Sequence, residues 1–401
     1  MACAPPRSIA AARPNLRPGR SGRGRVQSVG SDICGAVHAP AEFDDSMVGL
    51  FPVLRIVGAM RPITIVGGGL AGLSLALGLR QGGAPVRVCE AGDYPRHRVC
   101  GESISGLDSE TVATLGLAPV LEAAVWLRHL EWHDAGRRLR ADVLPEPARG
   151  LSRWALDQAL AHAVTAAGGH IETNCRAARD PSGPEAAGRV DCAGRQPATH
   201  SPWIGLKCHL ADLPNEADLE MHMSPHGYVG LSRIEGGRYN LCGLFRRDGL
   251  KPTGGRPFIF DYLAHCGFNR LLKRLEAAEP VPDSDCSVAA LSYEPRRPLA
   301  GHLALGDARG LIPPFTGNGM TLAFQNAAMV LPMLLAYSRG EFDWTDCTQR
   351  CAEAARVRFG RRLAVARSVQ HCLVTPGLFP FVATLARTGL FPFHLLFRLT
   401  R

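Results

Sequence analysis

The stretch that decides the fold is residues 62–90, which read PITIVGGGLAGLSLALGLRQGGAPVRVCE. The first apolar run, residues 63–66, ends in glycines, which is typical of a buried parallel strand. Helical spacing follows over 70–79, and a second apolar run, 86–89, ends at Glu90. This order predicts strand, turn, helix and second strand, the first unit of a dinucleotide-binding sheet, and Glu90 is placed to accept hydrogen bonds from ribose hydroxyls.

The glycines between the strand and the helix match the spacing G-x-G-x-x-G, with Gly67, Gly69 and Gly72. The first allows the tight turn, the second lets a pyrophosphate approach the backbone, and the third lets the helix pack on the strand. Leu70 and Ala71 begin the helix, where unpaired N–H groups and a partial positive charge can hold phosphate. The alternative, a glycine-rich turn that binds nothing, is disfavoured because strand, glycines, helix, second strand and acid occur in order.

A second candidate contact lies far along the chain, in residues 303–330, which read LALGDARGLIPPFTGNGMTLAFQNAAMV. A short apolar strand ends there at Asp307, whose carboxylate can accept hydrogen bonds from hydroxyls of an extended cofactor. A glycine-rich helix start follows, with Gly317, Gly319 and Met320. The amides of Gly319 and Met320 can face a ring on which negative charge builds.

Further motifs carry a family resemblance. They are P-R-x-x-x-C-G-E at residues 95–102, LSRWALD at 151–157, G-D-A-x-G-x-x-P-P at 306–314 and G-x-G-M at 317–320. Together with the glycine turn they resemble the FAD-dependent monooxygenases of the p-hydroxybenzoate hydroxylase type. The sequence is most similar to the branch that contains geranylgeranyl reductases and flavin halogenases, over about residues 62–330.

The resemblance implies FAD as the cofactor, with NADPH or NADH as its reductant. It places Arg98, Cys100 and Gly101 against the cofactor and Arg153 near the FAD phosphates or ribityl chain. Asp307 would then meet the ribityl hydroxyls, with the flavin ring near residues 317–320. No catalytic acid or base and no metal ligand is assigned.

The predicted fold class is α/β, with a Rossmann-like FAD-binding domain, an antiparallel β-sheet substrate domain and a helical C-terminal section. Short runs of alternating polarity over 202–248 favour the antiparallel sheet. The predicted boundaries are 60–200 and 280–338 for the FAD-binding domain, 201–279 for the substrate sheet and 339–401 for the C-terminal helices. Within the substrate sheet, the sequence leaves open whether side chains such as Tyr228, Leu231, Tyr239 and Leu244 face a pocket or pack under helices.

The resemblance implies an FAD-dependent oxidoreductase. The leading hypothesis is a monooxygenase that hydroxylates a small aromatic or polyketide-like molecule through a C4a-hydroperoxyflavin. The alternatives are reduction of an isoprenoid double bond, as in geranylgeranyl reductases, and a flavin-binding protein without turnover. The family's Asp-Gly pair is reduced here to VDCAGR at 190–195, and the loop-like stretch before it predicts an eroded or missing strand. The tryptophan-rich element of flavin halogenases is not found, which disfavours halogenation.

Composition and charge distribution exclude some classes of binding partner. The formal net charge is +9, but six arginines and no acid lie within the first 31 residues. The rest shows no basic stripe, so no nucleic-acid partner is expected; the expected partner is a small hydrophobic or aromatic substrate. No run approaches the roughly 18 apolar residues of a membrane span. The tail, 375–401, mixes phenylalanines with arginines, which suits peripheral membrane contact, a lid over an oily substrate or packing on the main body.

The first 59 residues are rich in Pro, Gly and Arg and are predicted to be a disordered extension. The favoured explanation is that translation starts at Met60, and a targeting role is the alternative. Since no apolar run suits a secretory signal, the expected location is the cytoplasm, with membrane association through the tail left open. The 13 cysteines include no C-x-x-C pair. The pairs Cys347/Cys351 and His222/His226 are interpreted as structural rather than metal-binding.

Overall fold

The computed structural model describes residues 59–134, 137–177, 186–195, 201–213, 217–289, 301–310 and 317–374, with isolated residues between 384 and 399. The predictions about residues 1–58, about the Pro-Pro element and about most of the apolar tail lie outside the described residues. The two ends of the predicted cofactor site lie inside them.

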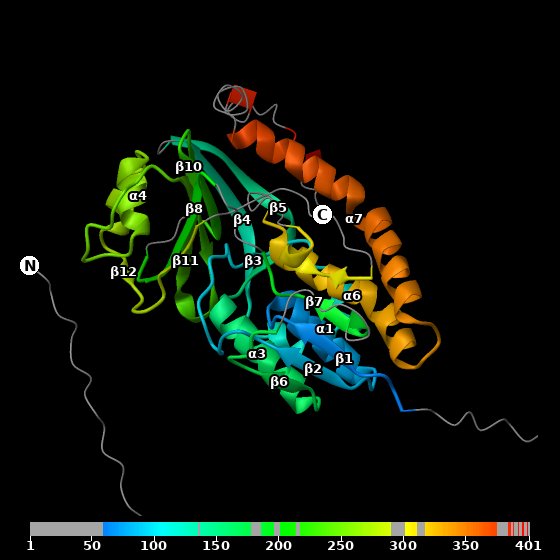
Figure 1. Ribbon diagram of the computed structural model, residues 1–401. Helices are drawn as coiled ribbons and strands as arrows, with labels where there is room; N and C mark the ends of the chain where they lie inside the picture. Colours follow the sequence, from blue (N-terminus) through cyan, green and yellow to red (C-terminus); the bar gives the residue numbers. More distant parts are fainter. Residues whose placement is uncertain are drawn as a thin grey trace, which may run out of the picture. The chain divides into compact units, whose positions relative to one another are not determined.

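A parallel sheet carries the glycine turn (Figure 1). Its order is β14-β7-β1-β2-β6, and every neighbouring pair runs parallel. The strands are β1 Ile63–Val66, β2 Val86–Cys89, β6 His170–Glu172, β7 Arg189–Asp191 and β14 Leu303–Ala304. The predicted α/β class is therefore confirmed.

The strand near residue 190, which was predicted to be eroded or missing, is present but short. β7 has only three residues, but it pairs with β1 on one side and β14 on the other. Val190 is fully buried at its centre. Pairing with two neighbours stabilises a strand that is too short to show a pattern of its own.

An antiparallel sheet forms the second layer of strands. Its order is β12-β8-β11-β10-β9-β4-β5-β3, with β13 also paired to β8. Only the β4–β9 pair in it runs parallel among the described pairs. The strands are β3 Ser103–Ile104, β4 Val125–Asp134, β5 Arg137–Gly150, β8 Trp203–Ala211, β9 Leu219–Ser224, β10 Gly227–Arg233, β11 Tyr239–Arg246, β12 Glu279–Pro280 and β13 Cys286–Ala289. The sheet thus extends beyond the range 201–279 predicted for it.

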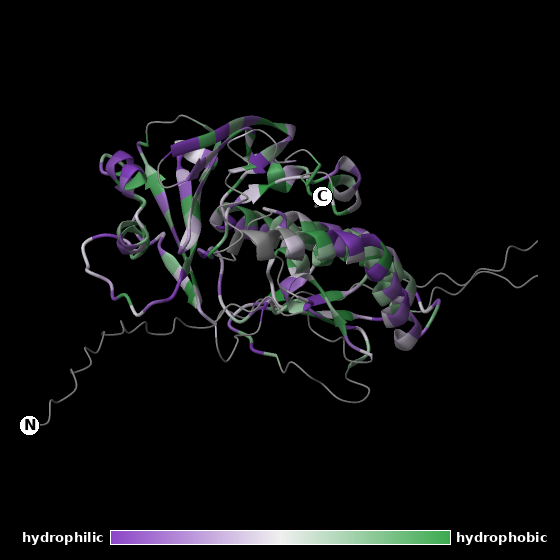
Figure 2. Ribbon diagram, turned by 90° about the horizontal axis from the view of Figure 1, so that it is seen from above, coloured by the Kyte–Doolittle hydropathy of each residue, from purple (hydrophilic) through white to green (hydrophobic). Residues whose placement is uncertain are grey.

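The two faces of this sheet differ. Because side chains alternate along a strand, one face of β8, β10 and β11 packs in a core with α4 Ile259–His265 and α5 Asn269–Leu275. Leu231 and Tyr239 belong to that core. The opposite face carries the side chains of alternate positions, among them the cross-strand pair Tyr228 and Leu244. In Figure 2 hydrophilic and hydrophobic residues are interleaved along the elements, as this alternation requires.

Helices cover the parallel sheet. α1 Leu70–Gln81 packs against α3 Arg153–Ala166 and against α6 Gly319–Ser338, and α7 Trp344–Val374 runs along α6 (Figure 1). The short helix α2 Ser109–Thr114 also contacts α6. α6 is long and apolar enough to cross a membrane by composition, but 72% of that stretch is buried inside the protein, as in a core helix.

Candidate cofactor site

The three motif glycines differ in what surrounds them. A Cβ on Gly67, whose φ is +103°, would lie 2.3 Å from the carbonyl oxygen of Cys192. A Cβ on Gly72 would lie 2.0 Å from the carbonyl oxygen of Gly67. Nothing lies within 4 Å of a Cβ built on Gly69, which is the N-cap of α1. Two glycines therefore permit backbone packing, while Gly69 leaves open space in front of the helix start.

Glu90, the predicted ribose acceptor, is buried and already holds the turn. Its Oε2 accepts a hydrogen bond from the Gly68 amide at 2.7 Å, and its Oε1 accepts from the Gly92 amide at 3.0 Å. Arg96 donates to Oε1 at 2.5 Å. The structure therefore assigns Glu90 a role in shaping the loop, and its contact with a ribose stays a prediction.

Two arginines of the predicted site converge on one buried carboxylate. Arg98 Nε donates to Asp157 Oδ2 at 3.1 Å, and Arg153 donates to both Asp157 oxygens at 2.8 Å. Burial opposes the charge on Arg153, but the Asp157 carboxylate outweighs it and raises the pKa of Arg153. The other motif residues, Cys100 and Gly101, lie on the same loop, and nothing lies within 4 Å of a Cβ built on Gly101.

Asp307 lies at the same edge of the parallel sheet as the glycine turn. It follows β14, and the amide of Leu305 donates to the carbonyl oxygen of Asp191 at 2.9 Å. A Cβ on its neighbour Gly306 would lie 3.2 Å from the Cβ of Ala71. Asp307 is exposed, yet the surrounding protein raises the pKa of its carboxyl by desolvation, against the charge of Arg153. A recessed but open position accounts for both observations.

The start of α6 closes the far end of the predicted site. Asn318 is the N-cap, and nothing lies within 4 Å of a Cβ built on Gly317 or Gly319. The side chain of Met320 is buried in the core, which leaves its amide as the group able to meet a ligand. Thr321 Oγ1 donates to the carbonyl oxygen of Ser105 at 2.7 Å, so the segment just beyond the loop of Arg98, Cys100 and Gly101 is bonded to this helix.

These residues fit an extended, anionic dinucleotide. Arg98 Nη2 is buried and has no hydrogen-bond partner among the described residues, and Glu90 Oε2 is 3.8 Å away from it. An unsatisfied buried guanidinium N–H near a helix start is suited to phosphate. The guanidinium groups of Arg96, Arg98 and Arg153 outnumber the two carboxylates, Glu90 and Asp157, that these groups contact, and this excess of positive charge favours an anion.

Sequence reasoning missed a second group of residues beside this site. Glu102 is fully buried and contacts both Lys207 and His209 of β8. His97 lies next to Lys207 and stacks on Trp154, with ring centroids 4.5 Å apart. The signals in the sequence were Glu102 itself, at the end of the motif at 95–102, and a lysine between apolar neighbours in a chain with three lysines.

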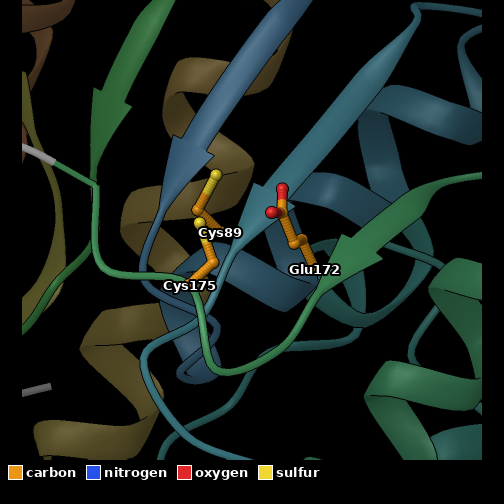
Figure 3. A group of neighbouring side chains, drawn as sticks. All are labelled: Cys89, Glu172 and Cys175. Atoms are coloured by element: carbon orange, nitrogen blue, oxygen red, sulfur yellow. The ribbon is translucent and has the colours of Figure 1, made fainter.

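Two further groups of potential metal ligands lie among the described residues. Cys89 and Glu172, the last residues of β2 and β6, lie near Cys175 (Figure 3), with ligand atoms within 4.8 Å of one another. Glu172 is already paired with Arg87, whose Nη2 donates at 2.5 Å. The Cys175 amide donates to the carbonyl oxygen of Glu90 at 2.8 Å, so this group borders the candidate site.

The second group is His133, Glu220 and His222, all buried. His222 therefore has its neighbours on β4 and β9, not at His226. The two imidazoles stack at 4.3 Å with an interplanar angle of 15°. The Nε2 atom of each imidazole already bonds a carboxylate, that of His133 to Glu131 at 3.1 Å and that of His222 to Glu220 at 2.9 Å. Cys347 and Cys351 are buried in the core.

The comparisons with known proteins concern the fold. No protein-family model matches the chain, and no curated protein matches its sequence. Among solved structures, the flavin-dependent brominase Bmp2 is 15% identical with a TM-score of 0.64, covering 84% of this chain and 92% of that one. Halogenase PltM is 13% identical with a TM-score of 0.65, covering 84% and 85%.

A third similar structure is PqsL from Pseudomonas aeruginosa, described as a probable FAD-dependent monooxygenase. It is 16% identical with a TM-score of 0.59, covering 80% of this chain and 99% of that one. The chain has the fold of FAD-dependent monooxygenases and flavin halogenases. The resemblance in fold inferred from the motifs is thus confirmed, and these structures do not bear on the geranylgeranyl reductase branch.

Proposed function

We propose that the chain is an FAD-dependent monooxygenase that transfers oxygen to a small aromatic or hydrophobic substrate. The observation that carries the proposal is the approach of Gly306 to Ala71, which brings Asp307 to the edge where the glycine turn opens. A single extended cofactor can then be held at both ends. The fold, shared with flavin-dependent enzymes, supports the same proposal.

The two ends of the candidate site would bind different parts of the cofactor. The amides at the start of α1 and the unsatisfied Nη2 of Arg98 would bind the pyrophosphate. Asp307 would accept hydrogen bonds from the ribityl hydroxyls, and the amides of Gly319 and Met320 would face the ring. Bound FAD, reduced by NADPH or NADH, supplies the electrons for oxygen activation. The protein binds and orients the cofactor and excludes water from its ring.

The substrate would lie between the cofactor and the antiparallel sheet. The sheet face opposite α4 carries Tyr228 and Leu244, and the loop with Cys100 and Gly101 is bonded to this same face. Leu244 is buried and Tyr228 partly so. An apolar side chain beside a phenol suits an aromatic or hydrophobic substrate.

Halogenation is the function of two of the similar structures, but one contact argues against it here. The resemblance to flavin halogenases implies a catalytic lysine. Of the three lysines in this sequence, Lys207 is the one beside the candidate site, and its Nζ bonds Glu102 at 2.7 Å with no solvent exposure. A lysine held in this way is not available to a halogenating species. Reduction of an isoprenoid double bond remains the alternative that the experiment must separate.

The experiment is an oxygen-dependence assay on the purified yellow protein. Oxidation of NADPH and NADH is followed with and without oxygen, in the presence of candidate phenols and prenyl lipids. Substrate-stimulated oxygen uptake with a hydroxylated product supports the proposal. Anaerobic turnover of a prenyl lipid would establish the reductase instead, and bound FAD that is never reduced would establish a flavin-binding protein without turnover.

A further inference from the structure

We infer that Glu102, held by Lys207 and His209, is a positioning residue that sets the arginine loop, residues 98–102, against the cofactor and the antiparallel sheet. The inference rests on the proposed function, because the loop matters only if it touches FAD. It assigns a role to Lys207 and His209, which lie outside the recognised motifs. Glu102 itself is the last residue of the motif at 95–102.

The carboxylate of Glu102 joins two separate parts of the fold. Its Oε1 accepts from Lys207 Nζ at 2.7 Å and from the amide of Arg153 at 2.9 Å. Its Oε2 bonds His209 Nε2 at 2.7 Å, and its own carbonyl oxygen accepts from the Leu151 amide at 3.1 Å. The side chain therefore connects β8 to the start of α3, whose first residue is Arg153.

The sheet also holds the two residues before Glu102. Asn240 Nδ2 of β11 donates to the carbonyl oxygen of Cys100 at 2.9 Å, and Ser232 Oγ of β10 donates to that of Gly101 at 2.8 Å. Lys207, His209, Ser232 and Asn240 all project from one face of the sheet, since Lys207 pairs with Cys242 and His209 with Asn240. Three neighbouring strands thus bond three consecutive residues of the loop.

The loop has a backbone conformation that needs this support. Glu102 has φ +55°, a left-handed conformation that a non-glycine residue rarely adopts. Its tertiary bonds offset that strain. Two of the loop residues, Cys100 and Gly101, are candidate cofactor contacts, so a loop that relaxes displaces them.

Glu102 carries the negative charge among the side chains of Lys207, His209 and His97. Burial opposes ionisation of Glu102, but the hydrogen bond from His209 and the charge of Lys207 outweigh it and hold its pKa below the usual value. His97 is kept neutral because burial and Lys207 lower its pKa to about 4, and its Nδ1 lies 3.3 Å from Lys207 Nζ as an acceptor. Neutralising Glu102 leaves the buried Lys207 without its counter-ion.

The same sheet offers a matched control. Glu220 of β9 is also buried, and it bonds His222 at 2.9 Å and Arg274 of α5 at 2.5 Å. It lies on the opposite face of the sheet, against α5. Glu220→Gln therefore disturbs an equivalent buried carboxylate without touching the arginine loop.

The experiment compares wild type, Glu102→Gln and Glu220→Gln by FAD titration, flavin absorption spectrum and thermal unfolding. We expect both variants to lower the melting temperature of the apoprotein. Only Glu102→Gln should weaken FAD binding, by about tenfold or more, and alter the bound flavin spectrum. Equal effects of the two variants on FAD, or no effect of Glu102→Gln, would overturn the inference.

A milder pair keeps the test informative if Glu102→Gln does not fold. His209→Gln retains a side-chain N–H that can donate to Glu102, whereas His209→Leu does not. FAD affinity should be near that of wild type in the first and several-fold weaker in the second; equal affinities contradict the inference. If the wild-type protein binds no FAD, the proposed function fails. If it binds FAD and the variants match it, only the positioning role fails.

Discussion

Gly69 is the N-cap of α1 and Gly72 lies in its first turn, but the absence of a side chain has a different effect at each position. Gly72→Ala places a Cβ 2.0 Å from the carbonyl oxygen of Gly67, so the backbone must shift. Gly69→Ala places a Cβ in open space. We predict that Gly72→Ala lowers the free energy of unfolding by about 2 kcal/mol or more.

We predict that Gly69→Ala leaves the unfolding free energy within about 0.5 kcal/mol of wild type and weakens FAD at least about tenfold. Urea unfolding of the apoprotein and an FAD titration measure the two effects separately. Gly360→Ala in α7 also places a Cβ in open space and lies outside the candidate site, so it should leave FAD affinity unchanged. Unchanged FAD affinity in Gly69→Ala would mean that no pyrophosphate approaches this turn.

His97 gives the protein a pH dependence at the residue scale. Burial, with Lys207 and His209, lowers its pKa from 6.5 to about 4. The unfolded chain therefore binds more protons than the folded protein between these values, and stability falls as the pH drops from about 6.5 toward 4. After allowance for solvent screening, the contribution is about 1 kcal/mol.

The measurement is the urea midpoint of wild type and His97→Gln at pH 7 and pH 5. The variant should lose less stability than wild type over this interval. Burial lowers the pKa of His133 as well, so the difference between the two proteins is the readout, not either slope alone. Equal losses would show that His97 titrates alike in the folded and unfolded chains.

At the element scale, α1 and α6 meet through small residues on one helix and leucines on the other. A Cβ on Gly78 would lie 2.8 Å from Leu331 Cδ2, and one on Gly82 would lie 2.5 Å from Leu335 Cδ2. Leu331→Ala should cost about 2–5 kcal/mol because it leaves a cavity in a buried contact.

Gly78→Ala should be neutral or destabilising alone, but stabilising by about 1 kcal/mol in the Leu331→Ala background. The added methyl then fills space and favours the helix. Urea unfolding of the four proteins in this cycle tests the coupling. Additive effects would show that the two side chains do not meet.

Elements with a strong local pattern could be predicted from the sequence. The strand, glycine turn and helix over 62–90 and the helix start at 319 carry their own apolar periodicity. β5 carries only part of such a pattern: residues 138–143 alternate polar and apolar side chains, but two prolines interrupt the rest of RRLRADVLPEPARG. Its strand structure comes from pairing with β4, a neighbour that no local pattern identifies.

In the candidate site, too, the residues that belong to local motifs could be predicted and the others could not. The glycine turn, Glu90 and Asp307 follow strands of a parallel sheet, whose carboxyl ends share one edge, so their proximity follows from the motifs. Glu102 and its partners on β8 are more than 100 residues apart in sequence. Nothing in either segment indicates the other, and only the folded chain brings them together.

At the scale of the whole molecule, the arginine loop connects the two sheets. Its residues bond α3 beside the parallel sheet, three strands of the antiparallel sheet and, through Ser105, the start of α6. Of the predicted cofactor contacts, Arg98, Cys100 and Gly101 lie on this loop, Arg153 begins α3, and Gly319 and Met320 begin α6. The site is therefore a property of the assembled sheets and not of the glycine turn alone.

The central claim is that one extended dinucleotide is held at both ends, by the glycine turn and by Asp307. The most direct test is a comparison of FAD and FMN binding by fluorescence titration, with Asp307→Ala as a control. The account predicts FAD at least about a hundredfold tighter than FMN, which lacks the adenosine half, and a weaker complex for Asp307→Ala. Equal affinities for the two flavins, or binding of neither, would contradict it.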